Sequence, residues 1–178
     1  MQATEPQTRT SETRREPLEY GRWVSIRPIE PADAAGLSAF YAALSPESAR
    51  RRFWSARRPT EEVLRRFTDP DAGGVVAVMG ESGPEDGAIV GHGSVQPCGD
   101  GEVELAFAVA DAYQGRGIGT RLMRAALEEA RRLGAHRVTA TMLIDNARMR
   151  QLLRGAGWPI VADRLDAGVE EITLAPAA

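Results

Sequence analysis

The chain has 178 residues, a net charge of −3 and 43% hydrophobic residues, which is ordinary for a single globular domain. All 22 basic residues are arginine, which excludes a Walker phosphate loop and Schiff-base catalysis because both need a lysine. One cysteine and two histidines exclude an internal disulfide and a four-ligand Cys/His zinc site, so we expect no metal.

The same composition limits the partners of the protein. Its slight acidity disfavours nucleic acid, and the lack of a long apolar run disfavours a membrane span or a secretion signal. We therefore expect a cytoplasmic protein that binds neither nucleic acid nor membrane, and the sequence leaves open whether it is a monomer or a homodimer.

The N-terminal segment predicts a tail followed by a strand. Residues 1–17 hold almost nothing that could join a core, so we expect a disordered tail there and one domain over residues 18–178. Residues 23–27 alternate in type and precede Pro28, as in a first strand.

Three helices are expected next. After Asp33, a suitable N-cap, apolar residues recur at the spacing of an amphipathic helix: Leu37, Phe40, Tyr41 and Leu44. A second helix is expected to begin at Ser45, with Pro46 in its first turn, and a third to follow Thr60.

The middle of the chain changes to a strand pattern. Apolar runs at residues 75–79, 88–95 and 102–109 are separated by segments rich in Gly, Pro and Asp, which mark turns. We expect an antiparallel meander.

The C-terminal part mixes both patterns. An amphipathic helix is predicted over residues 118–133, then a strand over residues 137–143 and a helix after Asn146. Two closing strands are predicted near residues 160–164 and 169–174.

Residues 114–120 lie between a predicted strand and a predicted helix and contain three glycines. Glycines leave backbone N–H groups unobstructed, and at a helix N-terminus these groups point along the positive end of the dipole. The segment therefore suits a phosphate or pyrophosphate, with Arg116 and Arg121 able to add charge-assisted hydrogen bonds. A dinucleotide fingerprint is excluded because its third glycine would fall on Thr120 and the preceding strands are expected to be antiparallel.

Residues 104–119 resemble the acyl-CoA motif of the GNAT superfamily of N-acyltransferases, Gln/Arg-x-x-Gly-x-Gly/Ala, whose fixed positions are filled by Gln114, Gly117 and Gly119. Residues 146–158 are similar to a later family element, in which an asparagine opens a helix that ends in Gly-aromatic. The order of predicted elements is also that of the family. The resemblance implies an α/β (α+β) fold with a central, mixed, mostly antiparallel sheet of about six to seven strands and about four helices.

A further resemblance covers residues 26–33, 44–48 and 52–53, which look like the catalytic domain of the bacterial protein lysine acetyltransferases of the Pat group. It implies that acetyl-CoA, or a related acyl-CoA, is the co-substrate and that a primary amine, first of all a protein lysine, is the acceptor. The alternatives are a small-molecule amine N-acetyltransferase and a non-catalytic acyl-CoA-binding module.

The resemblance also implies roles for single residues. In the Pat group a glutamate ten residues before the motif glutamine is the general base, and Glu104 has this position; its alternative is a charged side chain on the solvated face of a strand. Main-chain groups at Phe107 and Val109 are implied to face the pantetheine arm and the thioester. Asn146 is implied to bond that arm, to cap its helix, or both. Leu153 replaces the tyrosine that many members use as general acid, which leaves that role unassigned with Tyr113 nearby.

The complete set of acyl-CoA ligands implied by the resemblance is Phe107, Ala108, Val109, Gln114, Gly115, Arg116, Gly117, Ile118, Gly119, Thr120 and Asn146. Outside this set, His92 is expected to be a hydrogen-bonded structural residue and Cys98 not to be a nucleophile. The basic cluster at residues 50–52 and 57–58 could touch the 3′-phosphate of the coenzyme or an acidic protein, but a solvated helix face is the default expectation.

Overall fold

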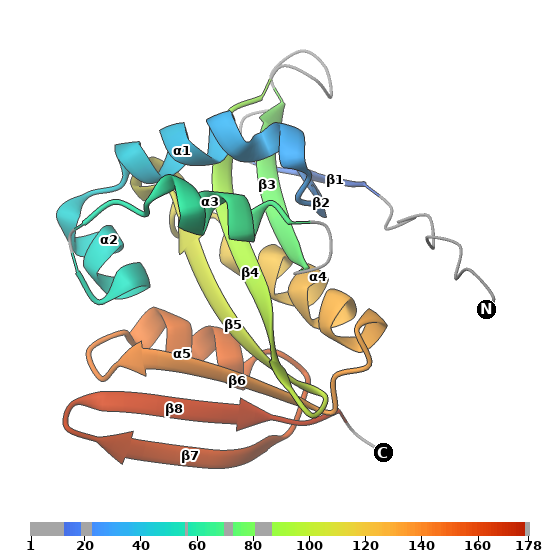
Figure 1. Cartoon of the computed structure of the whole chain (residues 1–178), viewed down its shortest axis with the longest axis vertical. Coiled ribbons are helices and arrows are strands. Elements are labelled where there is room, and N and C mark those ends of the chain that lie inside the picture. Colours follow the sequence, from blue (N-terminus) through green and yellow to red (C-terminus); the bar gives the residue numbers. More distant parts are fainter. Residues whose placement is uncertain (1–12, 19–22, 56, 70–72, 81–86, 177–178) are drawn as a thin grey trace.

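A computed structural model describes residues 13–18, 23–55, 57–69, 73–80 and 87–176 (Figure 1). Its centre is an eight-stranded sheet with the order β1-β2-β3-β4-β5-β6-β8-β7. The strands are β1 (Arg14–Pro17), β2 (Trp23–Pro28), β3 (Gly74–Gly80), β4 (Ile89–Gly99), β5 (Glu102–Val109), β6 (Arg137–Leu143), β7 (Ile160–Asp166) and β8 (Val169–Leu174). Among these strands only β5 and β6 pair in parallel.

Five α-helices flank the described part of the sheet. They are α1 (Ala34–Ala43), α2 (Pro46–Phe53), α3 (Glu61–Phe67), α4 (Ile118–Arg132) and α5 (Ala147–Arg154), with short 3-10 turns at Pro31–Asp33 and Asp111–Tyr113. In Figure 1, α1 and α3 lie over one face of β3 and β4, and α4 lies over the other. None of the described helices is both long and apolar enough to cross a membrane.

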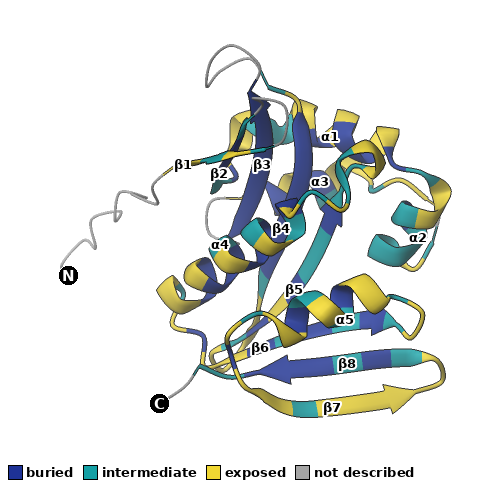
Figure 2. Ribbon diagram, turned by 180° about the vertical axis from the view of Figure 1, so that it is seen from behind, coloured by how far each residue is buried: buried dark blue, intermediate teal, exposed yellow. Residues whose placement is uncertain are grey.

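Each face of the sheet has its own apolar core. On one face, α1 and α3 pack against β3 through Leu37, Phe40, Leu64 and Phe67. On the other face, the apolar stripe of α4 packs against β2 to β5: Leu122, Met123, Ala126, Leu127 and Ala130. The inner strands are accordingly buried, whereas β7 at the edge of the sheet is mostly exposed (Figure 2).

The fold class is confirmed, with eight strands in the described residues where about six to seven were expected and five α-helices where about four were expected. The additional strand is β1, which lies where a disordered tail was expected over residues 1–17. The sequence of β1 is too polar to give a strand signal. The strand is held instead by antiparallel pairing with β2 and by the ion pair of Glu16 with Arg121 on α4. Residues 1–12 of the expected tail lie outside the described residues.

The parallel pair β5 and β6 separates part of the way along its length. Its register covers only the positions from Glu102 with Arg137 to Glu104 with Thr139, although both strands continue for several residues. The antiparallel pairing of β5 with β4 persists to Val109. The two halves of the sheet therefore diverge beyond Glu104, and the edge of β5 that faces β6 is free to accept another extended chain.

Candidate active site

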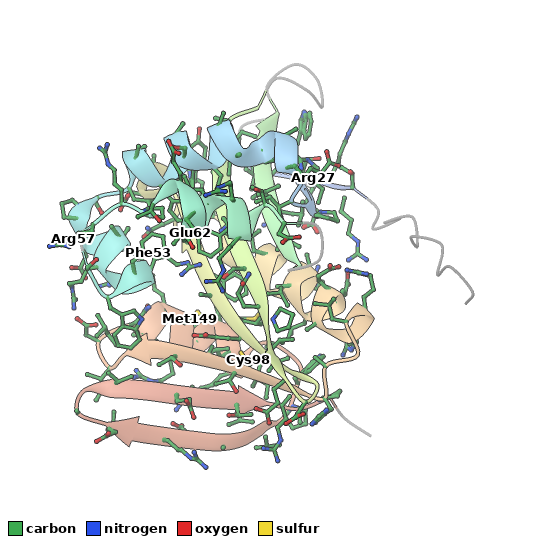
Figure 3. All side chains as sticks on the ribbon, in the orientation of Figure 1. Arg27, Phe53, Arg57, Glu62, Cys98 and Met149 are labelled. Atoms are coloured by element: carbon green, nitrogen blue, oxygen red, sulfur yellow. The ribbon has the colours of Figure 1, made fainter. Side chains whose placement is uncertain are left out.

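A cavity with a volume of about 650 Å³ lies where β5 and β6 diverge. It is bounded by the end of β5, the glycine-rich loop before α4, and α5, with Met149 of α5 on its wall (Figure 3). Nine of the residues expected to bind acyl-CoA line it: Phe107, Ala108, Val109, Gln114, Gly115, Gly117, Gly119, Thr120 and Asn146.

The main chain of β5 faces this cavity at alternate residues. The N–H of Ala110 donates to the carbonyl oxygen of Val90 on β4 at 2.8 Å. In an antiparallel pair, residues that exchange hydrogen bonds with the neighbouring strand alternate with residues whose polar groups point the other way. The N–H groups of Phe107 and Val109 therefore point away from β4, toward the cleft.

Two glycines in the loop before α4 have clear structural reasons. Gly117, the N-cap of α4, has φ +77°, a left-handed conformation that side chains rarely adopt. A Cβ at Gly119 would lie 3.2 Å from Cδ1 of Leu152, so this glycine lets α4 and α5 approach each other closely. The first turn of the 15-residue helix α4 has no acidic residue, and its free N–H groups are suited to an anion.

The arginines that surround the cavity are not the two that the sequence indicated. Arg121 pairs with Glu16 and donates to the carbonyl oxygen of Arg116 at 3.3 Å, and the guanidinium of Arg116 stacks over Tyr113 at 5.5 Å. Neither arginine lines the cavity: Arg121 is paired with Glu16 of β1, a strand that the sequence did not predict, and Arg116 lies over Tyr113. The lining arginines are instead Arg51, Arg124 and Arg148.

Ile118 also differs from expectation. Its side chain is 1% exposed and belongs to the core under α4, so only its main chain is near the loop. Leu153, at the position of the family tyrosine, is fully buried in the same core, while the neighbouring Leu152 lines the cavity. Tyr113 is the one lining residue with a phenol.

Gln114 connects three elements at the cavity. Its Nε2 donates to Ser48 Oγ and to the carbonyl oxygen of Val109, both at 3.1 Å, and its Oε1 accepts from Arg148. The side chain thus joins α2, the end of β5 and α5. These bonds indicate that Gln114 shapes the cavity as well as lining it.

Asp111 reinforces the same junction and was not identified from the sequence. It accepts hydrogen bonds from the N–H of Ser45 (2.9 Å), from Ser45 Oγ (2.7 Å) and from Ser48 Oγ (2.7 Å). Desolvation opposes ionisation, but these bonds prevail and hold the pKa of Asp111 below its ordinary value of 3.8. The only sequence signal was the N-cap at Ser45, whose oxygen also accepts from the N–H of Ser48 at 3.2 Å.

Asn146 both caps a helix and lines the cavity, the two possibilities that the sequence left open. Its Oδ1 caps α5 by accepting from the N–H of Met149 at 3.2 Å, and the residue also lines the cavity. The basic cluster of α2 divides: Arg50 pairs with Glu47 and with Asp145 at 2.9 Å, while Arg51 lines the large cavity.

Glu104 lies in a smaller cavity of about 190 Å³ on the side of β4 and β5 that carries α2 and α3. The other lining residues are Arg52, Val63, Arg66, Phe67, Ser94, Gln96 and Ala106. Glu104 is exposed and does not line the large cavity. Its exposure is compatible with the second expectation from the sequence, a charged side chain on the solvated face of a strand. Both cavities border β5, because the adjacent residues Ala106 and Phe107 line one each.

His92 and Cys98 are outside both cavities. His92 is fully buried, and its Nδ1 lies 2.7 Å from the hydroxyl of Tyr41. Burial, with a smaller contribution from the charge of Arg52, lowers the pKa of His92 well below its ordinary value of 6.5, so the ring is neutral. Cys98 is exposed near the end of β4 (Figure 3).

Comparisons with known proteins bear on the family and the fold of the chain. The acetyltransferase Pat of Mycolicibacterium smegmatis is 35% identical over 163 residues, which are 88% of this chain and 47% of that protein, so the chain spans about half the length of this relative. The crystal structure of the GNAT domain of S. lividans PAT has a TM-score of 0.78 and 28% identity and covers 92% of this chain and 96% of that one.

The fold also occurs in a more distant protein. YncA of Salmonella typhimurium, solved with its cofactor acetyl-CoA, has a TM-score of 0.67 at 22% identity, covering 87% of this chain and 95% of that one. The model of the acetyltransferase (GNAT) family matches residues 39–158, well over half of the sequence. The chain therefore belongs to the acetyltransferase (GNAT) family.

Proposed function

We propose that the protein transfers an acetyl group from acetyl-CoA to a primary amine, with a protein lysine as the acceptor and Glu104 as the general base. The observation that carries the proposal is the large cavity, which joins the N-terminus of α4 to the unpaired edge of β5. The Pat relative, an acetyltransferase, supports the reaction class.

The residues of the cavity fit the parts of an acyl-CoA. The N–H groups of the loop and first turn of α4, residues 115–120, are suited to the pyrophosphate, and Arg124 adds positive charge beside them. The free edge of β5 at Phe107 and Val109 is suited to the amide groups of the pantetheine arm, which resemble a peptide. Asn146, at the start of α5, also lines the cavity.

The chemistry needs a neutral acceptor nitrogen. A lysine ammonium has an ordinary pKa of about 10.4, so a base is useful near pH 7. Glu104 takes a proton from the ammonium, and the lone pair of the resulting amine attacks the thioester carbonyl. The C–N bond forms and the C–S bond breaks. The second proton lost by the nitrogen balances the one gained by the sulfur, which leaves as the thiol. The N–H of Val109, which points into the cleft, stabilises the carbonyl oxygen as it gains negative charge.

The proposal is tested by two measurements on the same protein. Equilibrium dialysis should show retention of CoA, and thiol release from acetyl-CoA should accelerate when lysine-containing proteins or peptides are added. Retention of CoA without acceleration by any amine would favour a non-catalytic binding module, and no retention at all would overturn the proposal.

A further inference from the structure

The smaller cavity contains more than a general base. Its walls come from α2, α3, β4 and β5, and its polar lining consists of Arg52, Arg66, Ser94, Gln96 and Glu104. The register pairs Gln96 with Glu104 directly across the two strands, and Ser94 with Ala106. These side chains therefore project from the same face of the sheet.

Arg52 is held firmly in this lining. Its Nη2 donates to Ser94 Oγ at 3.0 Å, and its guanidinium lies over the rings of Phe53 at 4.9 Å and Phe67 at 5.1 Å. Stacking and the hydrogen bond fix the orientation of the charge before any ligand arrives. A fixed guanidinium suits recognition of a planar oxyanion.

Two nitrogen donors of the lining are buried and lack a hydrogen-bond partner in the described structure: Arg52 Nε and Gln96 Nε2. Buried donors are normally satisfied, so an unpaired pair in one cavity suggests an acceptor group supplied by a ligand. Both nitrogens can only donate, which specifies an acceptor atom, and among acceptors a carboxylate oxygen also complements the charge of Arg52.

The charge of the lining is unsuited to a simple amine. Arg52 and Arg66 contribute two positive charges and Glu104 one negative charge. An isolated ammonium group that approaches Glu104 would meet a lining with a net positive charge. An acceptor with both an amine and a nearby carboxylate would instead place its ammonium beside Glu104 and its carboxylate beside the two arginines.

From this juxtaposition we infer that the acceptor bears a carboxylate close to its reactive amine, and that Arg52 and Gln96 bind this carboxylate while Arg66 adds attraction from α3. The inference rests on the proposed function, since it places the amine at Glu104. The shared chemistry is an amine with a neighbouring carboxylate, either in a free amino acid or in a lysine beside an acidic residue of a polypeptide.

The test compares matched acceptors with acetyl-CoA and the intact chain. One pair is γ-aminobutyrate and its uncharged amide, and the other is a lysine peptide with glutamate or glutamine next to the lysine. We expect kcat/KM to be about tenfold higher for the carboxylate member of the pair that represents the true source. The pair that shows this preference distinguishes a free amino acid from a polypeptide.

Three variants connect the preference to the cavity. Gln96→Glu replaces the unpaired donor by a carboxylate, and Arg66→Gln removes a lining charge; both should bring the ratio of kcat/KM values within each pair toward one. Arg65→Gln is the matched control, because Arg65 is a neighbouring exposed arginine of α3 that does not line the cavity. Arg52→Gln should have the largest effect, and thermal melting and CoA retention check that each variant is folded.

A ratio near one in both pairs for the unaltered protein, or a ratio that neither Gln96→Glu nor Arg66→Gln lowers, would overturn the inference while leaving amine acetylation intact. Transfer to no amine, despite CoA retention, would overturn the proposed function and this inference together.

Discussion

Glu104 of β5 is paired with Thr139 of β6 at the last register position before these strands diverge. Its side chain lines the smaller cavity, and the main chain of β5 a few residues further on lines the larger one. One strand thus separates the candidate base from the candidate acyl-CoA site. Because β5 is anchored along its whole length by β4, the relative placement of both is rigid.

Glu104→Gln should lower kcat by about a hundredfold without changing the affinity for CoA, because the amide cannot accept a proton and lies outside the large cavity. The rate of the variant should rise as the pH approaches the pKa of the acceptor ammonium, about 10.4, since neutral amine then forms without help. Steady-state thiol release across this pH range measures both effects.

Glu102→Gln is the control for this substitution. Glu102 also lies on β5 but pairs with Arg137 at 3.6 Å and lines neither cavity. Its kcat should stay within a factor of about two of the unaltered protein, because an exposed ion pair contributes little. An equal loss in both variants would contradict a specific role of Glu104.

Arg124 and Arg121 give a second test, because both are on α4 but only Arg124 lines the large cavity. Arg124→Gln should weaken CoA binding about two- to fivefold, and the difference should shrink at high salt. Arg121→Gln should leave CoA affinity unchanged and lower the free energy of unfolding by about 1 kcal/mol, since it loses Glu16 and the bond to Arg116. Dialysis at two salt concentrations and urea unfolding separate the outcomes.

Much of the fold was predictable because its signals are local. The stripe from Leu37 to Leu44 is buried as expected, and the helix expected over residues 118–133 is α4. The strand β1 was not predictable, because the polar sequence Arg14–Pro17 is ordered by pairing with β2 and by Glu16, not by burial of its own residues.

The part of the site that is formed by main-chain groups and glycines was predictable from the sequence. Gly117 and Gly119 follow from conformation and close approach, which a motif records. Hydrogen bonds between side chains that are far apart in sequence are not marked by a motif. The bonds from Ser45 and Ser48 to Asp111 are of this kind. The adjacent Arg51 and Arg52 line different cavities, and this too depends on how α2 packs against β5.

The absence of lysine leads to a prediction about the protein itself. Because all 22 basic residues are arginine, the chain has no side-chain amine to accept an acetyl group. After incubation with labelled acetyl-CoA, peptide mass spectrometry should find stable label on added acceptor and, within the chain, only at the N-terminal amine. Stable label on an internal side chain would contradict amine specificity.

Asp111→Asn should destabilise the protein in a manner that depends on pH. The pKa of Asp111 in the folded state is below its ordinary value of 3.8, so ionised Asp111 stabilises the fold above that pH, and this contribution disappears as the pH falls through the lower folded value. The loss of free energy of unfolding in the variant, measured by urea titration, should therefore be full at pH 7 and shrink in acid below the ordinary value. Asp166→Asn, an exposed change at the end of β7, should cost little at either pH. If the loss in Asp111→Asn were the same in acid as at neutral pH, the hydrogen bonds from Ser45 and Ser48 would not depend on the charge of Asp111, and the junction of α2 with the end of β5 would need another explanation.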